Sequence, residues 1–528
     1  MTAVSSHPSK HLSNQAYLFS RSYDAIVIGS GIGGLTTATQ LAAKGYSVLV
    51  LEKYLIPGGS AGFFERSGES GTYRFDVGAS MIFGFGDKGT TNLLTRALAA
   101  VDRHIDTIPD PVQIAYHLPN GLKPKVHRDY DAFIHELTEY FPEEREGIRK
   151  FYDEAWRVFN YLNSMELLSL EELRYLMRVF GQAPLSCLGL ARYLPVNVGH
   201  VARKYIMNEQ LLKFIDMECY CWSVVPADRT PMINAGMVFS DRHYGGINYP
   251  KGGVGKIAEV MAEGLEEKGG TICYGARVTQ ILREGRKAVG VKLANGEEIR
   301  ARRVISNATR WDTFEKLLPA EELPNKERSW QQRYEQSPSF LSLHLGVEAG
   351  ALGDEADCHH ILLEDWKHME EEQGTIFVSI PTLLDPDLAP PNRHIIHTFT
   401  PSSMSCWEGL TRSEYKAKKQ RDAMSLVKRL EALWPGLSDR IELIEVGTPR
   451  THRKFLGRIN GSYGPIPSKT PLGLLGVPFN RTSVPNLYCV GDSTFPGQGL
   501  NAVAFSGFAC AHRVAVDLGK PQKLKSSR

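Results

Sequence analysis

Four residues near the N-terminus have the types and the spacing needed to bind a dinucleotide. Gly29, Gly31 and Gly34 form a GxGxxG pattern, and Glu52 follows at close to the ~20-residue offset at which an acid takes a ribose hydroxyl. Gly29 permits a tight turn, Gly31 lets a pyrophosphate approach the backbone, and Gly34 allows a helix to pack closely on a sheet. The alternative is a glycine-rich turn that binds nothing.

The segments around these residues favour the dinucleotide interpretation. The apolar run 24–28 predicts a strand buried on both faces, and 35–44 predicts a helix that Gly45 stops. Residues 46–51 predict a second strand, which ends at the acid. The free N–H groups at the start of such a helix hold phosphates. The sequence therefore predicts a Rossmann-type unit with a bound dinucleotide.

Two further glycine segments suit the same kind of ligand. Residues 57–60 (Pro-Gly-Gly-Ser) lie just past Glu52 and indicate a backbone that passes close to the ligand, although an ordinary loop is the alternative. Near the C-terminus, the strand-like run 486–490 ends in Gly-Asp, and 496–503 leads into a small-residue helix over 504–518. A buried strand followed by a glycine-rich helix start again suits a phosphate-bearing ligand.

The remaining periodic segments predict a mixture of helices and strands. Asn295-Gly296 is a strong hairpin signal, so the strands around it should form a meander that rejoins the first sheet. We expect strands over 73–80, 271–282, 288–293, 298–306, 339–347 and 394–400, and helices over 131–141, 144–163, 255–268, 311–317 and 412–433.

Two central stretches are unusually apolar. Residues 165–194 are dense in leucine with interspersed arginines, which fits either the core of a cap domain or a surface that dips into a membrane. Residues 219–249 are rich in aromatic side chains and methionine, which suits the wall of an apolar pocket or simply a core. The sequence leaves both alternatives open.

Composition excludes several classes of protein. The 528 residues carry a net charge of +2, which gives no electrostatic case for nucleic-acid binding. No uninterrupted apolar run approaches the ~18–20 residues that span a bilayer. Residues 1–22 have no apolar segment of the kind found in secretory signals, and we expect a flexible tail or a transit-peptide remnant. A full-length plastid transit sequence is not expected, because the first strand starts so early.

The cysteines predict no metal site. Eight cysteines in so long a chain do not make a disulfide framework, and they favour a reducing compartment. Cys219 and Cys221 form a CxC pair, and Cys358 precedes His359 and His360. Neither group has a partner pair at zinc-finger spacing, so we expect buried or surface thiols.

These separated pieces resemble one known family. With the 221–255 stretch and the C-terminal segment YCVGDSTFPGQGLNAVAFSGFACAHR, they make the chain similar to the flavin-containing carotenoid and retinoid oxidoreductases, and within them to the carotenoid cis–trans isomerases. The likeness runs from residue 23 to about 515. Many relatives have Arg directly after the Gly-Gly pair, where this chain has Ser60. That difference leaves the electrostatics beside the flavin ring open.

The resemblance implies an α/β fold with two domains. A Rossmann-type FAD-binding domain, discontinuous in sequence, would comprise 23–104, 246–310 and 483–518, and an inserted α+β substrate-binding or cap domain would comprise 105–245 and 311–482. The implied FAD contacts are Gly29, Gly31, Gly33, Gly34, Glu52, Lys53, Gly58, Gly59, Ser60, Val278, Asn307, Gly491, Asp492, Gly499, Leu500 and Asn501.

The resemblance also implies a reaction. It is the FAD-dependent cis-to-trans isomerisation of a poly-cis carotenoid (prolycopene, or tetra-cis-lycopene) to all-trans-lycopene, redox-neutral overall with reduced flavin. The alternatives are a carotenoid or retinoid desaturase or saturase with net redox, and a nicotinamide-dependent or non-catalytic dinucleotide-binding protein. Product mass separates the first two, and a bound yellow chromophore excludes the last.

Catalysis requires that the bond order of a polyene double bond be lowered transiently. Reduced flavin could give and recover an electron or hydride, or an acid could protonate the polyene. Asp228, Asp241, His243 and Tyr244, in or next to the apolar stretch, are the candidate acids, and a structural role is the alternative for each.

The implied partners follow from a water-insoluble substrate. They are the carotenoid itself and a membrane surface, with NAD(P)H as a candidate electron source and other carotenoid-pathway enzymes as candidate partners. The expected location is peripheral, on the cytoplasmic side of a cyanobacterial-type membrane or on a plastid membrane.

Overall fold

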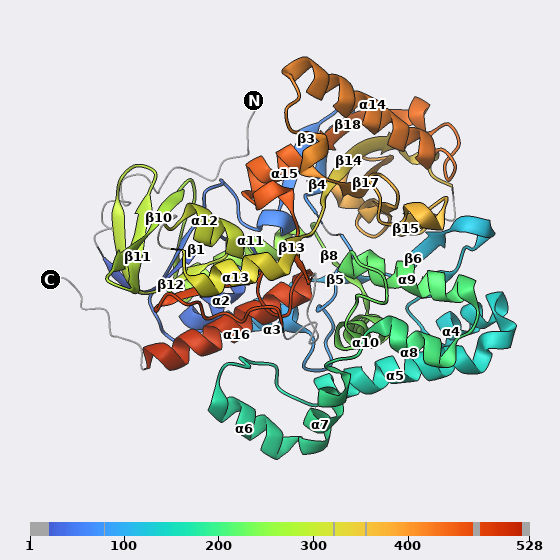
Figure 1. The fold of residues 1–528 in the computed structure, drawn as a ribbon. Coiled ribbons are helices and arrows are strands. Elements are labelled where there is room, and N and C mark those ends of the chain that lie inside the picture. The colour runs from blue at the N-terminus through green and yellow to red at the C-terminus, as the bar shows by residue number, and fades with distance from the viewer. Residues whose placement is uncertain (1–20, 79, 320–322, 354–355, 468–475, 520–528) are drawn as a thin grey trace.

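A computed structural model describes residues 21–78, 80–319, 323–353, 356–467 and 476–519, which form two large sheets with helices around them (Figure 1). The predicted N-terminal tail lies outside these residues, except for Arg21 and Ser22. The chain passes from one sheet to the other several times, so each sheet contains strands that are far apart in the sequence.

The first sheet contains the predicted Rossmann unit. Its strand order is β10-β11-β12-β1-β2-β9, and β20 pairs with β12. The strands are β1 (Ser22–Ile28), β2 (Val48–Leu51), β9 (Thr271–Cys273), β10 (Val278–Glu284), β11 (Lys287–Leu293), β12 (Glu298–Ser306) and β20 (Leu487–Cys489). Pairs around β1 are parallel, whereas β10, β11 and β12 form an antiparallel meander that rejoins the sheet, as predicted.

Three helices pack together beside this sheet. They are α2 (Ile32–Ala43), α11 (Gly255–Glu267) and α16 (Leu500–Leu518). Helix α2 begins three residues before the predicted start, because Gly33 and Gly34 lie inside its first turn. A Cβ at Gly34 would stand 2.3 Å from the carbonyl oxygen of Gly29, so the close packing predicted for Gly34 is real. Helix α16 likewise begins four residues early, directly after Gly499.

One predicted strand is wrong as a single element. The run 271–282 is divided into β9 and β10, with Gly275 at φ +68° between them. The two pieces lie at opposite ends of the strand order, since β9 pairs with β2 and β10 opens the meander. A left-handed residue breaks an extended run whose apolar pattern continues on both sides.

The second sheet has the strand order β18-β14-β17-β16-β15-β6-β7. Its strands are β6 (Val112–His117), β7 (Lys125–His127), β14 (Ser339–Glu348), β15 (His359–Leu362), β16 (Ile376–Ser379), β17 (Arg393–Ser402) and β18 (Ile441–Gly447). The pairs are antiparallel except for β15 with β6. One face packs its leucines against α14 (Arg412–Leu430), and this core includes Leu341, Leu343 and Leu345.

A group of helices covers the space below this sheet in Figure 1. They are α4 (Tyr130–Tyr140), α5 (Arg145–Asn163), α6 (Leu173–Gln182), α7 (Pro184–Tyr193), α8 (Val198–Tyr205), α9 (Glu209–Ser223) and α10 (Met232–Asp241). The predicted helices over 131–141 and 144–163 are confirmed as α4 and α5. Helices α6 and α7 project at the bottom of the view, away from both sheets. None of the helices in the described part of the chain is long and apolar enough to cross a membrane.

Smaller elements join these parts. They are α3 (Leu93–Ala99), α12 (Arg310–Lys316), α13 (Asn325–Arg333), α15 (Pro449–Leu456) and the strand pairs β3 (Phe63–Ser67) with β4 (Thr72–Asp76), β5 (Thr107–Pro109) with β8 (Asn248–Pro250), and β13 (Tyr334–Gln336) with β19 (Pro465–Pro467). The two large sheets use the two sets of segments that the sequence groups into domains. The exact domain boundaries stay a prediction.

Candidate active site

A single cavity of about 1980 Å³ runs from the glycine turn after β1 to helices α6 and α7. Both large sheets and the helices α9 and α10 contribute to its wall. Pockets for one small ligand usually measure ~300–1,000 Å³. The cavity is therefore large enough for a cofactor together with a second, long ligand.

The glycine turn lines one part of this cavity. A Cβ added at Gly31 would lie 2.7 Å from Asn307 Nδ2 and 3.9 Å from the carbonyl oxygen of Gly58. Gly31 is also the residue that caps α2, so the free N–H groups of that helix open here. The space between Gly31, Gly58 and Asn307 fits a pyrophosphate that binds to the backbone. It leaves no room for a side chain at position 31.

Glu52 lies at the end of β2 and its carboxylate is already held in place. Oε2 accepts hydrogen bonds from the backbone N–H of Ser30 at 2.8 Å and from its hydroxyl at 2.7 Å, and Oε1 accepts one from the Tyr54 N–H at 2.8 Å. A carboxylate has about four acceptor sites, so about one remains for a ribose hydroxyl. The arrangement orients the acid toward the cavity that it lines.

The other end of the predicted cofactor site comes from the C-terminal segment. Asp492 forms an ion pair with Arg458, and Gly499, at φ +102°, is the residue before α16. Nearly all the predicted FAD contacts line the cavity, namely Gly29, Gly31, Gly33, Glu52, Lys53, Gly58, Gly59, Ser60, Val278, Asn307, Gly491, Asp492, Gly499, Leu500 and Asn501. Gly34 does not line it and instead serves helix packing. These residues fit a dinucleotide, and their role as ligands stays a prediction.

Ser60 also lines the cavity, as does Tyr463. The Tyr463 hydroxyl lies 3.1 Å from His452 Nδ1, and the Arg458 guanidinium lies over its ring. Burial raises the pKa of Tyr463 to about 12, although the charge of Arg458 opposes the rise. Ser60 and Tyr463 therefore contribute neutral hydroxyls to the cavity wall.

The second sheet gives the cavity a wall that the sequence analysis did not assign. Along β14, Phe340, Ser342 and His344 line the cavity, while the leucines between them point into the core. His397 on β17 stacks on His344 with ring centres 4.2 Å apart. Burial lowers the pKa of His397 to about 3, so this imidazole is neutral at physiological pH. The period-2 alternation of polar and leucine positions is the signal that could have found this wall.

Another part of the wall is apolar and comes from the 219–249 stretch. Trp222, Val224, Ile233, Met237 and Val238, on and between α9 and α10, line the cavity. These side chains offer a long hydrophobic contact surface and few hydrogen-bonding groups. These five side chains agree with the pocket-wall interpretation of the stretch, whereas Cys219, Tyr220 and Phe239 belong to the hydrophobic core.

Three of the four candidate acids lie away from the cavity. Asp228 is at the surface and forms a bidentate ion pair with Arg203, with one contact at 2.9 Å. His243 packs among aromatic rings, and burial lowers its pKa to about 3, which makes it a poor proton donor. Tyr244 is 38% exposed. None of these three belongs to the cavity wall.

Asp241, the fourth candidate, lines the cavity at the C-terminal end of α10. Its Oδ1 accepts a hydrogen bond from Thr91 Oγ1 at 3.1 Å, and its Oδ2 has no hydrogen-bond partner within the described part of the chain. The carbonyl of Thr91 accepts a hydrogen bond from Asn501 Nδ2 at 2.8 Å, so Asp241 is linked to the predicted cofactor segment. Burial raises the pKa of Asp241 to about 7, which keeps much of the group protonated near neutrality.

A buried ion pair fixes the chain beside Asp241. Arg242 contacts Glu218 with Nη1–Oε1 at 2.8 Å, and both side chains are almost fully buried. Tyr116 and Tyr152 donate hydrogen bonds to the same carboxylate at 3.0 and 2.9 Å. With every partner present, the network holds the end of α10 and thereby positions Asp241.

Sequence comparisons identify the family. The family model for flavin containing amine oxidoreductases matches residues 32–515. The chain is 60% identical to a chloroplastic prolycopene isomerase of Arabidopsis thaliana over 95% of this chain and 84% of that protein, and 58% identical to one of Daucus carota over 96% and 82%. The chain belongs to the prolycopene isomerase family of flavin-containing oxidoreductases. The likeness found in the sequence is therefore confirmed, and the cofactor of the family is a flavin.

Solved structures share the fold of this family. An oxidoreductase from Methanosarcina mazei is 19% identical, with a TM-score of 0.61 over 92% of this chain and 99% of that chain. Putrescine oxidase with putrescine bound is 14% identical, with a TM-score of 0.60 over 94% of this chain and 99% of that chain. At these identities the likeness concerns the fold alone, and it confirms the predicted α/β class.

Proposed function

We propose that this protein catalyses the FAD-dependent isomerisation of prolycopene, tetra-cis-lycopene, to all-trans-lycopene without net redox. The observation that carries the proposal is the identity of about 60% to prolycopene isomerases over almost the whole chain. The cavity supports it independently, because one continuous space joins the predicted FAD contacts to a long apolar wall.

The protein's own contribution is positioning and exclusion of water. Bound FAD, held by the glycine turn, Glu52 and the C-terminal segment, would supply a reversible donor of an electron or hydride when reduced. The apolar side chains of α9 and α10 hold the polyene in the cavity, and the neutral imidazole of His397 on β17 also contributes to the cavity wall. A low-polarity cavity also protects a transient charge on the polyene from attack by water.

Asp241 is the residue that we assign to proton chemistry. It is protonated to a large extent at neutral pH, it lines the cavity, its Oδ2 has no hydrogen-bond partner among the described residues, and its helix is fixed by the Glu218–Arg242 pair. A carboxylic acid in this state can share a proton with the polyene and recover it, so no proton is consumed.

Product mass tests the proposal against its main rival. Phytoene desaturases at 25–27% identity and a retinol reductase at 27% are more distant relatives, which makes net redox the alternative. We expect anaerobic incubation with prolycopene to yield all-trans-lycopene of unchanged mass. A product that differs by pairs of hydrogen atoms would replace the isomerase with a desaturase or saturase.

We also infer that the carotenoid is taken up from a membrane surface through α6 and α7. The exposed fractions of Leu173, Met177, Phe180 and Leu185 are 67, 60, 51 and 80%, so these side chains do not fill a core. Leu176, Met177 and Phe180 of α6 also line the cavity. Exposed apolar side chains next to Arg174 and Arg178 suit an anionic lipid interface.

The double variant Leu173→Ser/Leu185→Ser tests this uptake route. Both side chains are mostly exposed, so we expect a folded, flavin-loaded protein that sediments several-fold less with anionic liposomes and turns over lipid-borne prolycopene correspondingly slowly. Met424→Ser, an exposed apolar residue on α14, is the control. Unchanged liposome binding would contradict the proposal, and loss of flavin would return the helices to a structural role.

The setting of the reaction follows from these proposals. The protein works as a peripheral protein on a plastid or cyanobacterial-type membrane, and the chloroplastic location of its relatives supports the plastid. NAD(P)H is the proposed source of the electrons that keep the flavin reduced, and other carotenoid-pathway enzymes are the proposed neighbours that deliver the substrate.

A further inference from the structure

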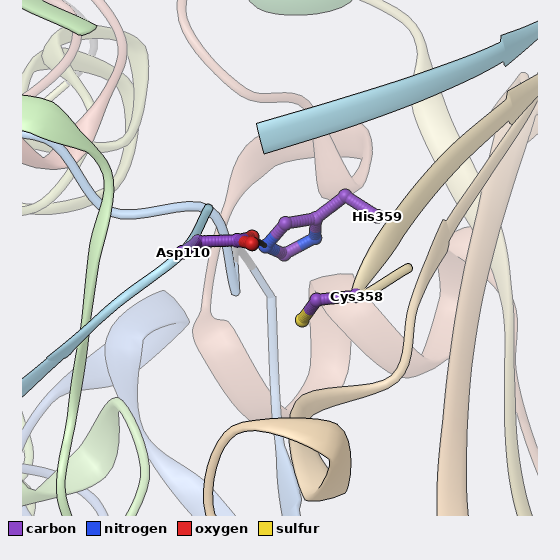
Figure 2. A group of neighbouring side chains, drawn as sticks. All are labelled: Asp110, Cys358 and His359. Carbon is purple, nitrogen blue, oxygen red and sulfur yellow. Dashed lines mark ion pairs between the residues drawn. The ribbon is translucent and has the colours of Figure 1, made fainter. Parts of the chain in front are cut away.

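A cluster of three potential metal ligands lies at one end of the second sheet, outside the predicted FAD contacts. Asp110 stands between β5 and β6, while Cys358 precedes β15 and His359 begins it (Figure 2). Because β6 and β15 run parallel as neighbours, their N-terminal ends meet at the same edge of the sheet. The carboxylate, thiol and imidazole ligand atoms all lie within 4.8 Å of one another, and each residue is at most 3% exposed.

Two polar atoms of this trio face each other without a hydrogen bond. His359 Nε2 and Asp110 Oδ2 are 3.5 Å apart, and neither has a hydrogen-bond partner among the described residues. Within the described part of the chain, Cys358 Sγ has one hydrogen bond, to the carbonyl oxygen of Ile380 at 3.5 Å. Buried polar atoms in native proteins are almost always satisfied, so this pair requires an explanation.

The separation of the pair suits two ligands of one ion. Zinc binds nitrogen and oxygen at about 2.0–2.1 Å, which places two tetrahedral ligands roughly 3.3 Å apart. Hydrogen bonds between such atoms are usually ~2.7–3.2 Å long. The distance of 3.5 Å is therefore long for a hydrogen bond and close to the ligand separation around a tetrahedral metal.

The chemistry of the three side chains selects the kind of metal. Sulfur, imidazole nitrogen and carboxylate oxygen together suit Zn²⁺, whereas Mg²⁺ and Ca²⁺ take oxygen ligands. A thiolate and a carboxylate would balance the charge of a divalent ion in this buried place. The other imidazole nitrogen, Nδ1, lies 2.9 Å from Ser379 Oγ, as the second nitrogen of a metal-bound histidine usually has a partner that fixes its orientation.

The polar side chains next to these three residues have other partners, so they are not available as further metal ligands. His360 Nδ1 lies 3.1 Å from His117 Nε2, and its Nε2 lies 2.9 Å from the carbonyl oxygen of Asp357. The Asp357 carboxylate pairs with Lys125 at 2.9 Å. Three protein ligands thus converge, and a fourth position is left for water.

We propose that Asp110, Cys358 and His359 bind one Zn²⁺ ion per chain. The ion would link the start of β6 to the start of β15, two segments that are far apart in the sequence. His359 also lines the large cavity, so the ion would stiffen the cavity wall from behind. This assignment is independent of the isomerase proposal.

Metal analysis of the purified flavoprotein tests the site. After loading with Zn²⁺ and removal of loosely bound metal by gel filtration, we expect about one zinc per chain by mass spectrometry. The double variant Cys358→Ala/His359→Ala should lose this zinc. The control is Cys273→Ala, which removes a thiol of similar burial on β9 and should keep it.

A second measurement needs no variant. Co²⁺ in a tetrahedral site with a thiolate ligand absorbs strongly at longer wavelengths than oxidised flavin, so loading the wild-type protein with Co²⁺ should produce that band at one equivalent. Zinc well below one per chain together with no cobalt band would overturn the proposal. Equal zinc in the double variant and the control would also overturn it.

Discussion

We expect the Gly31→Val variant to purify without its flavin. A Cβ at this position would lie 2.7 Å from Asn307 Nδ2. The branched side chain of valine would also occupy the space between Gly31 and Gly58, where the pyrophosphate must approach the backbone. Asn307 Nδ2 is the end of a side chain that can move, so the fold should survive while the ligand is excluded. The measurement is flavin absorbance per protein, which should fall to background.

Gly353→Val is the matched control for this variant. Gly353 is exposed, and a Cβ there would meet nothing within 4 Å, so the same chemical change should leave the flavin content unaltered. Circular dichroism reports whether each variant is folded. A folded Gly31→Val protein with full flavin content would remove the phosphate-binding role from this turn.

The second large effect is expected for Asp241→Asn. The amide has the shape of the carboxyl group and can still accept the hydrogen bond from Thr91, but it cannot share a proton with the polyene. General acid–base catalysis typically contributes about 10²–10⁴-fold, so kcat should fall by roughly this factor while flavin content stays normal. Asp228→Asn, at the surface beside Arg203, should retain wild-type activity.

The pH dependence gives the same assignment a separate readout. Burial raises the pKa of Asp241 to about 7, and the protonated form is the active one in this proposal. Activity should therefore be high below pH 7 and decline as the pH rises through that value. The residual activity of Asp241→Asn should lack this decline. A wild-type rate in the variant, or an unchanged pH profile, would assign the proton to another group.

The cofactor end of the site could be predicted because its signals are local. Gly29, Gly31 and Glu52 lie within one strand–helix–strand unit, and their backbone requirements appear directly as glycine spacing. The predicted helix starts there differ from the structure by a few residues. Glycine is a poor helix former, so the sequence predicts that α2 starts after Gly34, whereas the helix starts at Ile32 and includes Gly33 and Gly34. Gly34 is needed there for close packing.

The cavity wall formed by the second sheet was harder to predict because it comes from pairing between distant strands. The sequence shows β14 as a strand, and the alternation of Ser342 and His344 with leucines identifies a polar face. It does not show that pairing of β14 with β17 places His397 directly beside His344 on this face. Asp228 and Asp241 also look alike in sequence, and only tertiary burial separates them.

The trio of Asp110, Cys358 and His359 is the extreme case. Cys358 and His359 were visible as neighbours in the sequence, and the expected absence of a metal followed from the lack of a nearby partner pair. The third ligand comes from a segment that parallel pairing of β6 with β15 brings to the same edge. No spacing rule along the chain contains that information.

The most direct test of the proposed reaction counts electrons. The protein, with its flavin reduced or oxidised, is incubated anaerobically with prolycopene in liposomes, and isomer formed is compared with reductant consumed. We predict many turnovers to all-trans-lycopene per reduced flavin, with no stoichiometric loss of reductant and little product on oxidised flavin. Consumption of one reductant per product, or equal activity with oxidised flavin and no reductant, would contradict isomerisation that depends on reduced FAD.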